Sequence, residues 1–138
     1  MSIKSEIRIS RRLAKAGLAS RREAEKLILD GRVTLNGKTV VEPWRNCTKK
    51  DLLKLDGITV SQSISTSLHA LHKPRGYLST SKDAVGRKTI FDLIDSKLQH
   101  LMIIGRLDYN SEGLMILTNN GELKRYLELP KNKFERTY

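Results

Sequence analysis

The sequence contains one cysteine, Cys47, and this excludes an internal disulfide. A single cysteine fits a reducing compartment, and we interpret Cys47 as a small buried apolar residue rather than a reactive thiol. No apolar run approaches the ~20 residues that a membrane-spanning helix needs, and the N-terminal stretch lacks the apolar segment of a signal peptide. We therefore expect a soluble, cytoplasmic protein without a membrane partner.

Aromatic residues make up only 5% of the chain, which argues against a surface on which many bases stack. None of the three histidines is spaced from a cysteine or another histidine as metal ligands are. His69 and His72 fall on opposite faces of a predicted strand, because side chains alternate along a strand. The glycines form no phosphate-binding loop pattern. The sequence therefore predicts neither a metal site nor a cofactor.

Acidic residues are outnumbered by basic ones, 15 against 26, which gives a formal net charge of +11. A positive field of this size suits an anionic partner and carries no information about the fold. The excess is denser near the N-terminus. Residues 1–60 hold 14 basic and 7 acidic residues, a net of +7, whereas residues 61–138 hold 12 and 8, a net of +4.

The N-terminal part predicts two short helices. Residues 9–16 have the apolar spacing of a helix, with Ser10 as its N-cap. A second helix begins at Ser20, where Glu23 stands at the spacing of a capping box, and it ends at Asp30-Gly31. We expect the apolar faces of both helices to pack on a sheet.

The following residues predict that sheet. Strand-forming residues 33–35 and 38–41 flank Asn36-Gly37, which is the strongest short signal for a β-hairpin. A second strand pair is predicted within residues 52–60. We therefore expect residues 1–60 to form a domain of two helices against a small twisted sheet.

Cations cluster on the expected outer faces of these helices and on the hairpin. A charged face is often only a solvated face, and the charges alone leave both interpretations open. Clustering favours anion contact, because like charges repel one another until phosphates neutralise them. The candidate contact residues are Arg8, Arg11, Arg12, Lys15, Ser20, Arg21, Arg22, Lys26 and Lys38.

Residues 8–60 resemble the S4 domain. The resemblance is carried by Arg-Arg-Leu-Ala-Lys-Ala-Gly-Leu-Ala-Ser-Arg-Arg-Glu-Ala-Glu, residues 11–25, and by Gly-Arg-Val-Thr-Leu-Asn-Gly, residues 31–37. It implies that the helices bind structured RNA, with residues 20–22 near a phosphate at a helix N-terminus. Phosphate contacts give affinity more than sequence readout.

A second domain is predicted after a polar linker, residues 61–67. Residues 68–73 alternate like a strand, Pro74-Arg75-Gly76 forms a turn, and residues 77–80 are expected to return as a strand. A short helix over residues 90–94 is expected to be capped by Thr89.

The apolar runs 101–104 and 114–117 predict two strands around a turn-rich insert. Residues 122–128 then read as a helix that ends before Pro130, with Leu123, Tyr126 and Leu127 facing inward. Residues 134–138 are expected to begin a further strand.

The insert between those strands holds Arg106 and Asp108, an unusual pair to place between two apolar strands. A carboxylate on a rigid scaffold can act as a nucleophile or base. Asp and Asn also favour turns, since their side chains hydrogen-bond the local backbone. The residues by themselves favour that structural role over catalysis.

A resemblance reverses that preference. The seventeen residues Gly105–Gly121, Gly-Arg-Leu-Asp-Tyr-Asn-Ser-Glu-Gly-Leu-Met-Ile-Leu-Thr-Asn-Asn-Gly, resemble the catalytic motif of the S4-containing pseudouridine synthases of ribosomal RNA. Lys73-Pro74-Arg75-Gly76 is similar to the Lys-Pro-x-Gly turn of the same family. Ser111 and Asn120 depart from it, since Thr and Asp are common there. We expect an α+β chain, with the first half of a mixed α/β catalytic domain over residues 68–138.

The resemblance also implies roles for individual residues. Asp108 is the catalytic carboxylate, acting on a uridine that is flipped out of the RNA. Arg106 supports its charge, and Tyr138, in Arg136-Thr137-Tyr138, stacks on the uracil. Lys73 and Arg75 face the RNA. The implied activity is isomerisation of a specific uridine in ribosomal RNA, with no cofactor or metal.

Members of that family continue beyond the residue equivalent to Tyr138. The sequence is therefore expected to be a fragment or a truncated gene product, with an exposed sheet edge that favours association. The alternative to an enzyme is a catalytically inactive S4 fragment that binds ribosomal RNA or assists ribosome assembly.

Overall fold

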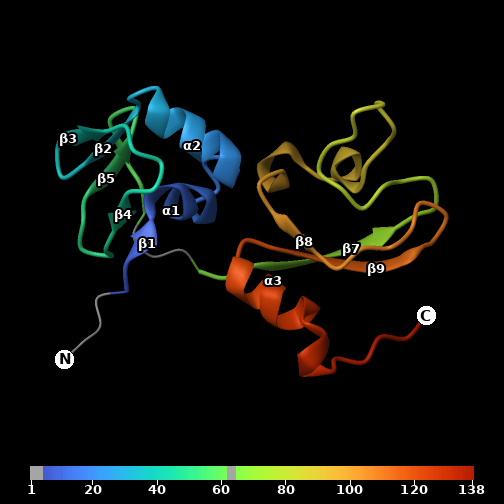
Figure 1. Ribbon diagram of the computed structural model, residues 1–138. Coiled ribbons are helices and arrows are strands. Elements are labelled where there is room, and N and C mark those ends of the chain that lie inside the picture. Colours follow the sequence, from blue (N-terminus) through green and yellow to red (C-terminus); the bar gives the residue numbers. More distant parts are fainter. Residues whose placement is uncertain (1–4, 62–64) are drawn as a thin grey trace. The chain divides into compact units, whose positions relative to one another are not determined.

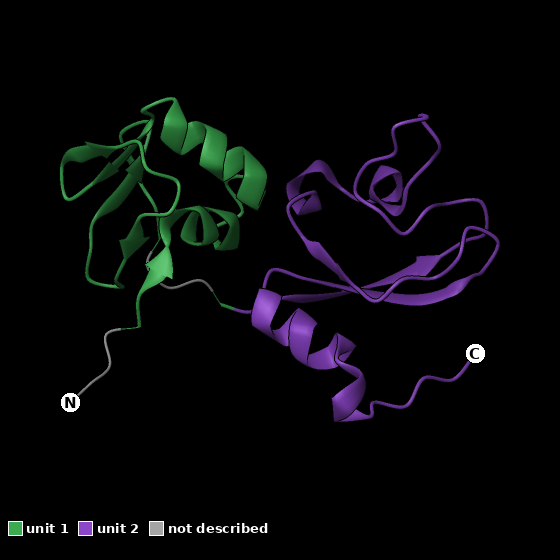
Figure 2. Cartoon of the chain, viewed as in Figure 1, with its two compact units in different colours: residues 1–65 green, residues 66–138 purple. Residues whose placement is uncertain are grey.

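The computed structural model describes residues 5–61 and 65–138. The chain divides into two compact units, residues 1–65 and residues 66–138, which Figure 2 shows in different colours. The predicted linker, residues 61–67, spans this division and includes residues 62–64, which lie outside the described residues. The two units are described separately below.

Unit 1 contains the two predicted helices, α1 (Ile9–Lys15) and α2 (Arg21–Leu29), visible in Figure 1. The capping box is confirmed. The Ser20 amide donates to the Glu23 carboxylate at 2.9 Å, and the Glu23 amide donates to the Ser20 hydroxyl at 3.2 Å. The predicted cap at Ser10 is wrong. Helix α1 begins earlier, at Ile9, because the Ile9 amide is held by the Arg45 carbonyl at 3.0 Å, and Ser10 is buried.

A four-stranded antiparallel sheet covers the helices, in the order β3-β2-β5-β6. The predicted hairpin is confirmed, and its turn residues Asn36 and Gly37 both have positive φ, as the tight turn requires. A second, short pair, β1 with β4, was not expected from the sequence. The strands are β1 (Ile7–Arg8), β2 (Val33–Leu35), β3 (Lys38–Val40), β4 (Asn46–Cys47), β5 (Leu53–Leu55) and β6 (Ile58–Thr59).

Arg12 is the first correction to the predicted charged face. Its side chain is buried within unit 1 instead of facing outward, and it is 5% exposed. The guanidinium donates to the carbonyl oxygens of Thr48 and Asp51, at 3.2 and 3.1 Å, and to the Cys47 sulfur at 3.7 Å. Arg12 therefore ties helix α1 to the turn after β4, and the prediction that it contacts RNA is wrong.

Replacing Arg12 by methionine is expected to lower the free energy of unfolding of the chain by about 2–3 kcal/mol, because two buried carbonyls lose their donor. Chemical denaturation followed by circular dichroism measures this. Arg22→Met removes an equal charge from an exposed site and should change stability by less than about 0.5 kcal/mol. Equal effects of the two substitutions would contradict a structural role for Arg12.

Unit 2 is built on a three-stranded antiparallel sheet in the order β7-β9-β8. The strands are β7 (Leu68–Lys73), β8 (Met102–Ile104) and β9 (Gly113–Thr118). The predicted strands on either side of the insert are confirmed, with Met102 paired to Thr118 and Ile104 to Ile116. Helix α3 (Gly121–Glu128) follows β9, and the 3-10 turns are η1 (Ile90–Leu93), η2 (Ser96–Leu98) and η3 (Pro130–Asn132).

One face of this sheet carries the core of unit 2. Met115 and Leu117 of β9 point to that face and pack with Ile90, Phe91 and Leu101. Alternation along β9 sends Leu114 to the other face, where it is exposed. The 3-10 turn η1 thus covers the sheet from one side, and its Thr89 amide donates to the Asp92 carboxylate at 2.8 Å.

Three expectations for unit 2 are wrong. Residues 77–80 form no return strand beside β7; β7 pairs with β9, and Leu78 makes a single bridge to Thr89 instead. Tyr126 points outward and is 55% exposed, where it packs edge-on against Phe134. Residues 134–138 adopt no strand, since no described strand pairs with them.

No helix within residues 5–61 and 65–138 combines the length and apolar character that crossing a membrane requires.

Candidate catalytic loop and nucleic-acid surface

Residues 105–112 form the loop between β8 and β9 and hold the candidate carboxylate; we call this segment the 105–112 loop. Its Asp108 side chain is exposed, as is Arg106. The Ser111 amide donates to the Asp108 carbonyl at 3.0 Å, which closes a tight turn inside the loop. The predicted turn is therefore present, closed by a backbone bond rather than by the Asp or Asn side chains, and Asp108 is exposed on it.

Lys73 lies beneath this loop. Its side chain is fully buried at the end of β7. The ammonium donates to the carbonyl oxygens of Asp108 at 2.9 Å and Ser111 at 2.6 Å, with longer bonds to Tyr109 at 3.4 Å and Pro74 at 3.2 Å. The loop is thus wrapped around one ammonium group. The prediction that Lys73 faces RNA is wrong, because its charge is already occupied by backbone carbonyls.

The electrostatics of Lys73 have two opposing causes. Burial lowers the pKa of the amine, and the nearby negative charge of Asp108 raises it, with burial the stronger. The negative charge of Asp108 therefore lies near a buried ammonium group. Lys73 therefore supplies charge support to Asp108 from below, a role that the sequence had suggested for Arg106.

Two further side chains fix the loop at its N-terminal end. The Ser79 hydroxyl donates to the Leu107 carbonyl at 2.7 Å and accepts from the Leu107 amide at 3.1 Å. Such a pair of bonds replaces a strand partner for the residue immediately before Asp108. Glu128, in the last turn of α3, accepts from the Gly105 amide at 2.8 Å. The backbone of the 105–112 loop is therefore held on both sides of Arg106.

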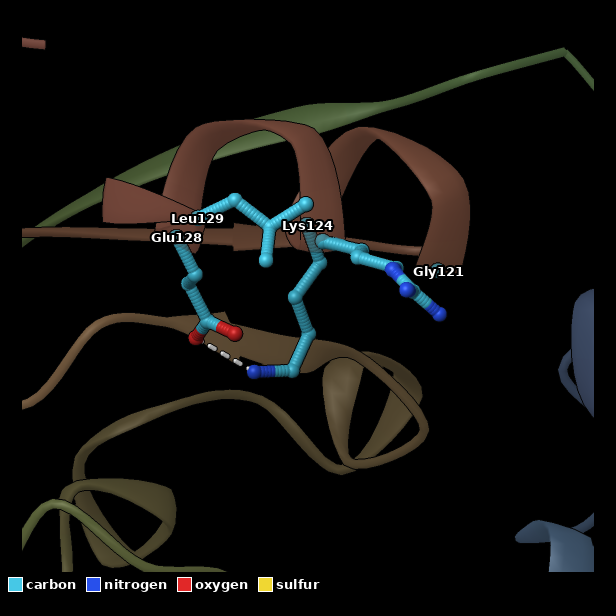
Figure 3. Close-up of a pocket in the computed structure, with 5 residues that line it drawn as sticks. Gly121, Lys124, Glu128 and Leu129 are labelled. Carbon is cyan, nitrogen blue, oxygen red and sulfur yellow. Dashed lines mark hydrogen bonds and ion pairs between the residues drawn. The ribbon is translucent and has the colours of Figure 1, made fainter. Parts of the chain in front are cut away.

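Glu128 also pairs with Lys124, one turn earlier on α3, as Figure 3 shows. Burial raises the pKa of Glu128, but the hydrogen bonds from Lys124 and Gly105 outweigh burial and hold it below its usual value. Glu128 is therefore ionised at neutral pH and keeps its bond to Gly105. Helix α3 is in turn begun by Asn120, whose side-chain oxygen accepts from the amides of Glu122 and Leu123.

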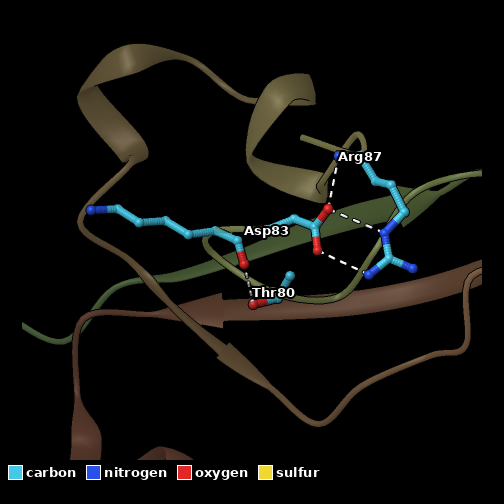
Figure 4. Close-up of polar contacts among 4 residues, drawn as sticks. Thr80, Asp83 and Arg87 are labelled. Atoms are coloured by element: carbon cyan, nitrogen blue, oxygen red, sulfur yellow. Dashed lines mark hydrogen bonds and ion pairs between the residues drawn. The ribbon is translucent and has the colours of Figure 1, made fainter. Parts of the chain in front are cut away.

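Tyr109 links the loop to the Lys-Pro-x-Gly turn. The Gly76 amide donates to the Tyr109 carbonyl at 2.8 Å, and Gly76 has φ of +86°. The charge of Arg87 is also close to Tyr109, and pairing with Asp83 raises the pKa of Arg87. Figure 4 shows this Asp83–Arg87 pair, whose two bonds between side chains measure 2.9 and 3.1 Å. The loop of residues 80–88 is thereby stiffened beside Tyr109.

Not all predicted site residues come together. Within the described residues, no hydrogen bond or ion pair joins Asp108 to Arg106 or to Tyr138, and Tyr138 is 93% exposed. Arg136, two residues before Tyr138, reaches back toward Gly105 at the start of the loop and donates weakly to the Leu127 carbonyl at 3.4 Å. The roles of Arg106 and Tyr138 therefore stay predictions.

Most of the candidate RNA-binding cations are accessible. Arg11 and Lys15 are half-buried on α1, and the Ser20 hydroxyl is used by the capping box. Their contact with RNA is not tested by the fold. The exposed candidates are Arg8, Arg21, Arg22, Lys26 and Lys38 in unit 1 and Arg75 in unit 2.

Comparison with models of known protein families identifies the family of the chain. Residues 67–138, just over half of the chain, match the RNA pseudouridylate synthase family model. The chain belongs to this family. Residues 7–53 match the model of the S4 domain, so the N-terminal part of this pseudouridylate synthase family member is an S4 domain.

Curated relatives agree with this assignment. The chain is 43% identical, over 95% of its own length, to an uncharacterized RNA pseudouridine synthase of Rickettsia felis, covering 57% of that protein. It is 40% identical, again over 95% of its length, to ribosomal large subunit pseudouridine synthase B of Bacillus subtilis, covering 53%. The chain thus spans about half the length of the curated relatives it matches.

A solved crystal structure of a pseudouridylate synthase matches with a TM-score of 0.48 and 26% sequence identity, covering 91% of this chain and 54% of that one.

Sequence reasoning missed Ser79 and Glu128 as supports of the loop. Ser79 lies in a segment expected to be a strand, and nothing in its surroundings indicates a partner 28 residues away. Glu128 ends a helix, where acidic residues are unfavourable next to the negative end of the helix dipole. That local mismatch is the one signal that could have indicated a tertiary role. Within the described residues, no three metal-binding side chains cluster.

Proposed function

We propose that this chain carries the catalytic carboxylate and RNA-docking domain of a synthase that converts a specific uridine of ribosomal RNA to pseudouridine. The observation that carries the proposal is the presentation of Asp108. It is an exposed carboxylate on a turn whose backbone is bound by Lys73, Ser79 and Gly76. Rigid presentation of a charged group is what nucleophilic catalysis requires.

In the proposed reaction Asp108 acts on a uridine that has left the base stack, since a stacked base cannot reach the carboxylate. The bond between the ribose carbon and uracil N1 breaks, and a bond from that carbon to uracil C5 forms. The hydrogen at C5 leaves as a proton to water, and N1 gains a proton. The reaction is an isomerisation, so it consumes no co-reactant.

Individual residues support this chemistry in different ways. The Lys73 ammonium donates to the Asp108 carbonyl and brings a positive charge near the carboxylate. Arg106, exposed two residues before Asp108, would occupy the space that the flipped base leaves, a role that follows from its match to the family pattern. Tyr138 would stack on the uracil once RNA is bound, a contact that follows from its match to the family pattern.

The proposal is tested by tritium release. Ribosomal RNA carrying tritium at C5 of its uridines is incubated with the chain, and tritium in the water is counted. Release that depends on Asp108 supports the proposal. Absence of release at any protein concentration, with RNA bound, would contradict the assignment of the chemistry to this part of the molecule.

The S4 domain is proposed to dock the RNA through phosphates. Arg21 and Arg22 are exposed at the start of α2, and neutralising both (R21Q, R22Q) should weaken binding of ribosomal RNA about tenfold. The magnitude of the slope of log affinity against log salt concentration should decrease by about 2, which is one for each phosphate contact that the variant loses. Filter binding over a salt series measures both quantities.

A matched control removes two exposed lysines from unit 2, Lys97 and Lys131, by substitution with glutamine. This variant loses the same total charge, so a general effect of net charge would weaken binding equally. Equal losses of affinity in the two variants would contradict a docking role for the α2 arginines.

A further inference from the structure

Unit 1 has a single aromatic residue, Trp44, which is also the only tryptophan of the chain. Its side chain is 69% exposed, in the segment between β3 and β4. Trp44 is not one of the buried residues that form the core of unit 1. An exposed indole offers a large, flat apolar face with a polar N–H to a binding partner.

The backbone that carries Trp44 is fixed. The Arg45 amide donates to the Glu42 carbonyl at 3.1 Å, and the Arg45 carbonyl accepts from the Ile9 amide at 3.0 Å. Pro43 restricts the backbone directly before the indole. The backbone of Trp44 is therefore held at the start of helix α1. On binding, only the freedom of its two side-chain torsions would be lost.

Exposed cations follow Trp44 in the sequence. Arg45 follows directly, and Lys49 and Lys50 stand on the turn after β4. That turn is rigid, because the Asp51 carboxylate accepts from the Thr48 amide at 2.6 Å and from its hydroxyl at 2.9 Å. The segment around Trp44 therefore offers one aromatic ring and several exposed positive charges on a well-fixed backbone.

A fourth cation, Arg8, reaches this surface through strand pairing. Its backbone pairs with Asn46, two residues after Trp44. An apolar protein partner would have to bury these cations without compensation, which is costly. A nucleic acid matches both features of this surface, because its phosphates neutralise the cations and one of its bases can cover the indole.

We propose that Trp44 stacks on an unpaired base of RNA, while Arg45, Lys49 and Lys50 hold the phosphates beside that base. The inference rests on RNA being the partner of unit 1, as proposed above, and adds a contact to the bases. A paired base offers no free face in the middle of a duplex, so the surface selects single-stranded RNA. The scarcity of aromatics still excludes a platform of several stacked bases.

The indole reports on its own environment, because the chain has no other tryptophan. Short oligoadenylate, a duplex of equal length and heparin are titrated separately into the chain. Oligoadenylate is expected to quench the tryptophan fluorescence, whereas heparin, which carries charge without bases, should bind without quenching. Quenching by heparin to the same extent, or no quenching by oligoadenylate, would overturn the inference.

Substitutions separate stacking from charge. Trp44→Ala should weaken oligoadenylate binding about tenfold and leave heparin binding unchanged, and Trp44→Phe should recover most of the affinity. The thermal unfolding midpoint should stay constant, because the indole lies outside the core. Unchanged oligoadenylate affinity in Trp44→Ala would also overturn the inference.

The result is independent of the proposed catalysis, because tritium release depends on Asp108 in the other unit. Retained ribosomal RNA binding in Trp44→Ala, without any loss of affinity for oligoadenylate, would overturn base stacking and leave phosphate docking intact. Quenching by anionic lipid vesicles, with no quenching by RNA, would overturn the inference and indicate that Trp44 binds a membrane surface.

Discussion

Replacing Asp108 by alanine is expected to abolish tritium release from labelled ribosomal RNA, by at least about a thousandfold, while RNA affinity stays within about twofold. In the proposed reaction the carboxylate is the group that attacks or drives departure of the base, and no neighbouring side chain on the 105–112 loop replaces it at the same position. Asp108→Asn should have the same effect, since an amide keeps the shape and loses the charge.

The matched control is Glu112→Gln, which removes an exposed carboxylate from the same loop. It should release tritium at nearly the rate of the unchanged chain. Loss of activity in both variants would indicate that the total negative charge of the loop matters, and persistent release in Asp108→Ala would contradict the proposed chemistry.

Replacing Lys73 by methionine is expected to lower the free energy of unfolding of the chain by about 3 kcal/mol or more. Four carbonyl oxygens lose their donor, and a buried polar group without a partner costs its full desolvation. The 105–112 loop is released at the same time, so tritium release should fall at least about a hundredfold, beyond what the unfolded fraction explains. Denaturant unfolding and the release assay measure the two effects.

The control for this substitution is Lys97→Met, at an exposed site in the same unit, which should change neither quantity. Ribosomal RNA affinity should stay unchanged in Lys73→Met, because the S4 domain lies in the other unit. A large loss of affinity with normal stability would show instead that Lys73 contacts RNA, as the sequence first suggested.

The parts of this fold that the sequence predicts correctly are those with local causes. The Ser20–Glu23 capping box needs only three residues of spacing, and Asn36-Gly37 specifies a hairpin by its own backbone preferences. The strands around the 105–112 loop follow from two short apolar runs. In each case the interacting residues are close in sequence, so a pattern is sufficient.

The errors come from contacts that are distant in sequence. Long cations are almost always exposed, so Arg12 and Lys73 were expected at the surface. Their burial depends on carbonyl groups 35 or more residues away, which no local pattern indicates. The strand expected at residues 77–80 is also absent: β7 pairs with the distant strand β9 and not with the segment that follows its own turn.

For the candidate site, the resemblance identified the loop and the structure supplied its supports. The position of Asp108 was predicted, and its exposure agrees with a reactive group. Arg106 was expected to balance its charge because it is near in sequence, whereas the ammonium beneath the loop belongs to Lys73. Ser79 and Glu128 were not expected, since side chains that bond backbone groups far away in the sequence leave no recurring sequence pattern.

The contacts of the Lys73 ammonium also bear on how unit 2 folds. Its partners lie 35, 36 and 38 residues along the chain, apart from the neighbouring Pro74. Closing such long segments costs chain entropy that is recovered only when the distant contacts form. Lys73 itself pairs with Gly113 of β9, so we expect the loop to become ordered together with the pairing of β7 and β9. A partly folded unit without this pairing would leave the buried ammonium without the loop carbonyls that it binds.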